Sequence, residues 1–139
     1  MIDGGELVMP KIPSALLLLV LATISYLEAE DKPTSLTDAR SAVETNLRTP
    51  EGKAYDQQLE MDFVQNHLAA VHQCRQNVGS DRQSFWFLLR LDKDGTAKEV
   101  LLYPETKLGT CSRLALLKDK FPLPPKAAYW ASIYLKPSR

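Results

Sequence analysis

The chain has 139 residues, the length of one ordinary domain, and its 17 lysines and arginines balance 17 aspartates and glutamates. Because zero net charge offers no clustered positive potential, binding to nucleic acid or to an acidic membrane surface is not expected. The sequence also contains no phosphate-binding loop and no supported Ser, His and Asp set, so it predicts no enzyme, no cofactor and no metal site.

An apolar run lies near the start of the chain. Residues 12–27 are mostly apolar, with Lys11 before them and acidic residues from Glu28 after them. This order is typical of a secretory signal, and the run falls short of the roughly twenty residues that span a bilayer. We expect residues 1–29 to be a signal peptide, with Met9 the better start, and the released protein to be soluble and periplasmic, with no integral membrane segment. An uncleaved signal anchor is the alternative.

Helical patterns follow the signal. Residues 30–48 form a polar segment in which a short helix is expected, and residues 49–139 form the expected domain. Thr49 suits an N-cap and Pro50 the first helical position, and Gly79 suits the end of the helix. A long helix is predicted from residue 53 to 77, because apolar residues recur there at three- and four-residue steps, namely Leu59, Phe63, Val64, His67, Leu68, Val71 and Cys74.

Two strands and a turn come next. Residues 85–91 and 97–103 are rich in aromatic and aliphatic side chains, which predicts two strands. Gly95 between them supplies the positive φ of a tight hairpin turn, and Asp92 or Asp94 can bond the following backbone. The Asp-x-Asp-Gly order also occurs in calcium loops, but the further acidic ligands are missing.

The last third of the chain adds a helix and a strand. Residues 110–120 are predicted as a helix with Thr110 as its N-cap, and the prolines from Pro122 make a stiff connection to a strand at 128–136. The fold class that follows is α+β: a two-layer domain with two main helices on one face of a three-stranded antiparallel sheet, in the order α-β-β-α-β.

The second half of the chain resembles the C-terminal domain of TonB-family energy transducers. The resemblance is carried by a Leu-Asp-x-Asp-Gly-x-Ala-x-x-Val-x-Leu run and a Phe-Pro-x-Pro-Pro run before an aromatic strand, matched here by Leu91, Asp92, Gly95, Ala97, Val100, Leu102, Phe121, Pro122, Pro124, Pro125 and residues 129–135. The Pro-rich spacer of TonB is absent. The resemblance implies the fold and a terminal strand that receives an extended protein segment, without the transducer role.

Cys74 and Cys111 are the two cysteines. An even number in an exported chain favours a disulfide between them. A thiol nucleophile at Cys74 with His67 is disfavoured because the two residues lie about 10 Å apart along one helix. A zinc site that adds His72 is equally weak, since positions five apart on a helix point in different directions.

The outward side of the sheet is the predicted binding surface. Strand alternation places Phe85, Phe87 and Leu89 toward the helices and their neighbours on the other face. The expected partner-binding residues are Trp86, Leu88, Leu101, Tyr103, Tyr129, Trp130 and Tyr134. Monomers seldom leave such a patch bare. An equal alternative is that the segment from residue 31 to 47 folds across it.

The function expected from these features is that of a periplasmic protein-interaction module. It would bind a segment of another envelope protein, or a second copy of itself, through the terminal strand edge or the exposed sheet face. A small inhibitor or immunity protein for an envelope-acting enzyme is an alternative that the sequence does not separate from the first. A Cys-dependent envelope enzyme is the weakest alternative.

Overall fold

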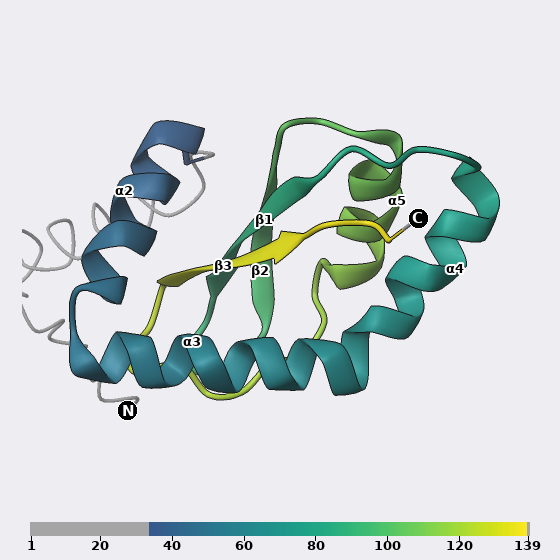
Figure 1. The fold of residues 1–139 in the computed structure, drawn as a ribbon. Coiled ribbons are helices and arrows are strands. Elements are labelled where there is room, and N and C mark those ends of the chain that lie inside the picture. The colour runs from purple at the N-terminus through teal and green to yellow at the C-terminus, as the bar shows by residue number, and fades with distance from the viewer. Residues whose placement is uncertain (1–33, 139) are drawn as a thin grey trace, which may run out of the picture. The chain divides into compact units, whose positions relative to one another are not determined.

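Three antiparallel strands form the centre of the computed structural model, which describes residues 34–138 (Figure 1). Strands β1 (Phe85–Leu91), β2 (Ala97–Tyr103) and β3 (Tyr129–Leu135) lie in the order β2-β1-β3. β1 is therefore the central strand and is paired on both sides. The predicted signal peptide, residues 1–29, lies outside the described residues.

The turn between β1 and β2 is the predicted hairpin. Gly95 has φ 82°, and its N–H donates to the carbonyl of Asp92 at 2.9 Å. The Asp94 carboxylate accepts from the Thr96 N–H at 3.0 Å and binds the Lys120 ammonium at 2.7 Å. These interactions lower the pKa of Asp94, with the Lys120 contact as the largest cause. A lysine thus lies on the carboxylate that a calcium loop would direct at its ion.

Helices cover one face of the sheet, here called the inner face. They are α3 (Pro50–Asp62), a π-helical turn η2 (Phe63–His67), α4 (Leu68–Val78) and α5 (Lys107–Leu116). Phe85, Phe87 and Leu89 of β1 are fully buried beneath them, as alternation predicted. The α+β class with two main helical segments on one sheet face is confirmed, but the helix predicted at 53–77 is longer and is interrupted at η2.

The helix N-termini follow their capping residues. The Thr49 hydroxyl accepts from the Gly52 N–H at 2.9 Å and Pro50 lies in the first turn of α3, as predicted. The N-cap of α5 differs from the prediction. Thr106, not Thr110, accepts from the Gly109 N–H at 2.9 Å, so the helix starts earlier and Thr110 lies inside it.

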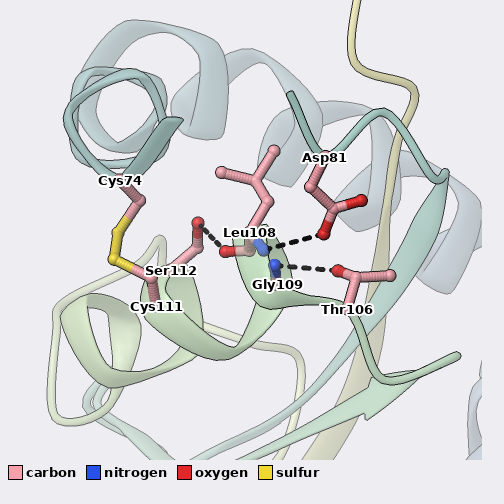
Figure 2. The surroundings of a disulfide bond; sticks show 7 residues. All are labelled: Cys74, Asp81, Thr106, Leu108, Gly109, Cys111 and Ser112. Carbon is pink, nitrogen blue, oxygen red and sulfur yellow. Dashed lines mark hydrogen bonds between the residues drawn. A yellow bond between two sulfur atoms is a disulfide. The ribbon is translucent and has the colours of Figure 1, made fainter. Parts of the chain in front are cut away.

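A disulfide joins α4 to α5 (Figure 2). Cys74 and Cys111 have Cα atoms 5.7 Å apart, so the predicted bond is confirmed. The start of α5 is also tied to the segment before β1, because the Asp81 carboxylate accepts from the Leu108 N–H at 3.2 Å, and Ser112 donates to the Leu108 carbonyl at 2.8 Å. One end of the domain is thus fixed by a covalent bond and several hydrogen bonds.

Helix α2 (Leu36–Leu47) lies on the opposite, outer face of the sheet. Ser35 caps it through the Asp38 N–H, and Ala39 and Val43 are buried against Leu88 and Trp130. Of the two alternatives for the outer face, cover by the N-terminal segment is therefore the one observed for these residues. Between residues 34 and 138, no helix is both long and apolar enough to cross a membrane.

Candidate functional site

The edge strand β3 is covered along its first half. The Asn46 side-chain amide donates to the Trp130 carbonyl at 2.8 Å, and the ring of Tyr129 packs edge-on against Tyr55 at 5.1 Å between centroids. Tyr55 in turn donates to the Pro122 carbonyl at 2.7 Å. Burial, followed by the nearby Tyr129 and Asp62, raises the pKa of Tyr55, so its hydroxyl stays a donor. A partner strand has no access at this end.

The second half of β3 is open at its edge. Since Trp130 directs its carbonyl away from β1, the alternation of an antiparallel strand directs the main-chain groups of Ser132 and Tyr134 the same way. Among the described strands, only β1 pairs with β3. The opposite edge of the sheet is better protected, because Ala97 of β2 exchanges two hydrogen bonds with Lys118 and Asp119. The open edge is thus confined to the end of β3.

A groove runs beside this open edge, on the inner face. Its volume is about 440 Å³, and it lies between residues 133–138 on one side and η2 and α4 on the other, where Val64, Leu68 and Val71 line it. Val64 is 63% exposed, an unusual position for a valine beside an unpaired strand. Arg75 of α4 donates to the Ser138 carbonyl at 2.6 Å and closes the far end of the groove.

The bend between α3 and α4 shapes this groove. In Figure 1 the helix runs along the sheet as α3 and then turns away as α4. The turn occurs at η2, where His67 has φ −121° and leaves helical geometry. π-Helical turns are a recognised cause of helix bends. The bend opens the space between the helices and the end of β3.

His67 fixes the bend to the loop before β3. Its ring is 4% exposed, with Nδ1 2.8 Å from an Asp119 oxygen and Nε2 3.1 Å from an Asp62 oxygen. The ring also stacks on Phe121, with centroids 4.2 Å apart. The prediction that His67 is a histidine at the core edge is confirmed, and His72 is exposed, as expected. Spacing alone did not reveal the two carboxylate partners, because Asp119 is 52 residues away in the chain.

The outer face carries most of the predicted partner-binding residues, but α2 covers half of them. Leu88 and Trp130 are buried against α2 and Leu101 is half-buried beside it, so the expectation that they are exposed is wrong. Tyr129 is also buried, but on the inner side, against Tyr55. Alternation gave the correct face for Trp130 but not the helix that covers it.

The other three predicted residues form a row of exposed rings. Trp86 of β1 pairs with Tyr103 of β2 on one side and with Tyr134 of β3 on the other. They are 42%, 44% and 48% exposed, and the Trp86 and Tyr134 rings lie 4.7 Å apart. This aromatic row, defined here as Tyr103, Trp86 and Tyr134, crosses the sheet beyond the cover of α2 and ends at the open edge of β3.

Catalytic and metal-binding chemistry finds little support among residues 34–138. The disulfide takes both sulfur atoms, so the thiol nucleophile considered at Cys74 is not free. No three His, Cys, Asp or Glu side chains gather there as metal ligands. What the geometry offers is an open strand edge, a groove and an aromatic row.

Comparison with protein-family models, with curated proteins and with solved structures finds no match to this chain. A functional proposal therefore depends on the geometry just described and on the motifs in the sequence.

Proposed function

We propose that the protein is an exported, periplasmic interaction module that binds an extended segment of another envelope protein along the open half of β3. The observation that carries this proposal is the groove between residues 133–138 and the bent helix. A strand edge supplies main-chain donors and acceptors, and a neighbouring groove supplies contacts for alternate side chains. The sequence resemblance to TonB-family C-terminal domains supports the same strand as the receiving edge.

The bound segment would be short. The contact between Asn46 and Trp130 limits it at one end, and the contact between Arg75 and Ser138 limits it at the other. Pro137 lacks an N–H, so the ladder would extend from Ser132 to about Lys136. Side chains of the segment on the inner side would meet Val64 and Leu68, and those on the outer side would meet Tyr134.

The disulfide supports export. Such bonds form and persist in oxidising compartments and are rare in the cytosol of mesophiles. The apolar run and its flanking charges in residues 11–28 favour the same route. Periplasmic location belongs to the proposal together with the partner.

The test is site-specific photo-crosslinking in the native host. A benzoylphenylalanine replaces Val64 in one variant and Met61 in a matched control. Both side chains are about 60% exposed on adjacent helical positions, at 63% and 61%, but only Val64 lines the groove. We expect one discrete adduct from position 64 and none of that mass from position 61, with the crosslinked peptide mapping to an extended region of the partner.

A second pair of variants checks the interaction without the photoprobe. Val64→Asp should abolish the adduct formed from a probe at Tyr134, whereas Met61→Asp should leave it. Both replacements are at exposed positions, so both proteins should keep their melting temperature. Identical adducts from positions 64 and 61, or an adduct only with a second copy of this chain, would contradict the proposed function.

A further inference from the structure

A second pocket lies on the outer face, and the proposed edge binding does not use it. Its volume is about 260 Å³, between α2 and the aromatic row. Leu88 and Ser132 form its floor, Val43 and Leu47 of α2 form one wall, and Trp86 forms the opposite wall. The middle of the pocket is therefore apolar and bounded by an aromatic ring.

One end of the pocket carries a positive charge. The Arg40 guanidinium lies 5.2 Å from the centre of the Tyr103 ring, on the β2 side of the sheet. Arg40 forms no ion pair with any carboxylate among residues 34–138. Stacking on Tyr103 holds the guanidinium in place while its N–H groups remain available. This end suits a carboxylate, which a guanidinium binds through two hydrogen bonds.

The other end of the pocket offers a hydroxyl and a carboxylate. Ser132 is 8% exposed on β3, and its hydroxyl makes no hydrogen bond with any described residue. Buried hydroxyl groups are normally paired. Glu44 lies one helical turn beyond Arg40, on the way to Asn46, which contacts β3. The two polar groups at this end therefore suit a ligand group that donates one hydrogen bond and accepts another.

The distance between the two ends limits the ligand. β2 and β3 flank β1, so at about 4.8 Å per strand the pocket spans roughly 10 Å from the Tyr103 side to the Ser132 side. Arg40 and Glu44 are about 6 Å apart along the helix axis at 1.5 Å per residue. We propose that this pocket binds a small aromatic carboxylate whose ring carries a hydroxyl group opposite the carboxylate-bearing position.

Each part of such a ligand has a partner in the pocket. The carboxylate lies against Arg40, the ring packs between Trp86 and the aliphatic side chains, and the hydroxyl lies between Ser132 and Glu44. An anion without a hydroxyl donor is disfavoured because its ring would leave Ser132 unpaired and would approach the Glu44 carboxylate without a compensating hydrogen bond. A cationic ligand is disfavoured by the charge of Arg40.

The test uses three probes on the full, disulfide-bonded chain. They are 4-hydroxyphenylacetate, phenylacetate, which lacks the hydroxyl, and 4-hydroxyphenylacetamide, which lacks the charge. Binding is followed by the NMR shift of the Trp86 indole N–H. We expect a saturable shift with the first probe, and about tenfold weaker binding for each of the other two, the difference that one charge-assisted or buried hydrogen bond supplies.

Variants assign the two ends. Arg40→Gln should weaken binding of 4-hydroxyphenylacetate about tenfold, whereas Arg48→Gln, an exposed arginine just past α2, should change it less than twofold. Ser132→Ala should reduce the preference for the hydroxylated probe over phenylacetate. No saturable shift of the Trp86 signal, equal loss in Arg40→Gln and Arg48→Gln, or equal binding of all three probes would overturn the proposal. None of these results depends on the β3 edge, so the proposed partner binding is tested separately.

Discussion

The side-chain amide of Asn46 donates a 2.8 Å hydrogen bond to the main-chain carbonyl of Trp130, across 84 residues of sequence. This bond fixes the end of α2 to the edge of β3. It also closes the first half of that edge, where a carbonyl would otherwise be free to pair with another chain. α2 therefore does two things: it buries one half of the outer face, and it confines the open edge to the end of β3.

The first prediction concerns Trp130. Because this ring is 7% exposed beneath α2, Trp130→Ala should lower the free energy of unfolding by about 3–5 kcal/mol, as large buried aromatics do. Ile133→Ala, on the inner face, should cost a similar amount, about 2–5 kcal/mol. Urea denaturation of both variants measures this.

Trp86→Ala is the control for Trp130. Its ring is 42% exposed, so this variant should lose clearly less stability than Trp130→Ala. If Trp130→Ala proved as mild as Trp86→Ala, α2 would not cover the sheet in solution.

The features that the sequence predicted correctly are local. Alternation along residues 85–91 identified the buried face, and Gly95, Thr49 and Pro50 marked a turn and a helix start through their own backbone preferences. The disulfide followed from cysteine number and the expected compartment. In each case the residues that decide the structure are neighbours in sequence or a unique pair.

The features that were missed depend on distant contacts. The cover over Trp130 comes from Ala39 and Val43, whose small side chains give α2 a weak apolar stripe, although their spacing with Leu47 is helical. Apolar periodicity also passes through the π-helical turn without a break, so it did not reveal the bend at His67. The groove beside β3 exists because of that bend, and the binding site was therefore only partly predictable.

The second prediction concerns the disulfide. Cys74 and Cys111 are 37 residues apart, and closing a loop of that length should stabilise the fold by about 4 kcal/mol in the chain-entropy model. The double variant Cys74→Ala and Cys111→Ala should therefore unfold at a lower urea concentration. Dithiothreitol should shift the parent protein to the same extent and leave the double variant unchanged. A parent protein indifferent to reductant would contradict the bond.

The third prediction is a pH dependence at Asp81. The backbone N–H groups of Gln83 and Leu108 donate to its carboxylate and lower its pKa below the usual value (Figure 2). A lowered pKa in the folded state means that the stabilisation is present above about pH 4, the pKa of an unfolded aspartate, and is lost as the pH falls further. The stability difference between the parent and Asp81→Asn should therefore be constant from pH 5 to 7 and shrink toward pH 2.

Urea midpoints at intervals across this range measure the difference. Glu44→Gln is the control, because Glu44 is exposed and accepts no hydrogen bond from the described residues. Its difference from the parent should be small throughout. If Asp81→Asn differed from the parent equally at pH 2 and pH 6, the carboxylate would not stabilise the start of α5 through its charge.

The last prediction concerns the coupling of His67 to Asp119. The two side chains meet at 2.8 Å, on a ring that is almost completely buried and stacked on Phe121, so each loses its partner when the other is removed. Residues in such a contact show coupling energies of about 0.5–3 kcal/mol in a double-mutant cycle. His67→Ala, Asp119→Ala and the double variant should therefore give a coupling of about 1 kcal/mol or more by urea denaturation. A parallel cycle of His67 with Asp94, which binds Lys120 instead, should give a coupling near zero. Because the same histidine holds the bend that forms the groove, His67→Ala should also reduce the adduct formed from a photoprobe at Val64 under conditions where the protein remains folded. Full coupling with an unchanged adduct would show that His67 stabilises the fold without shaping the groove.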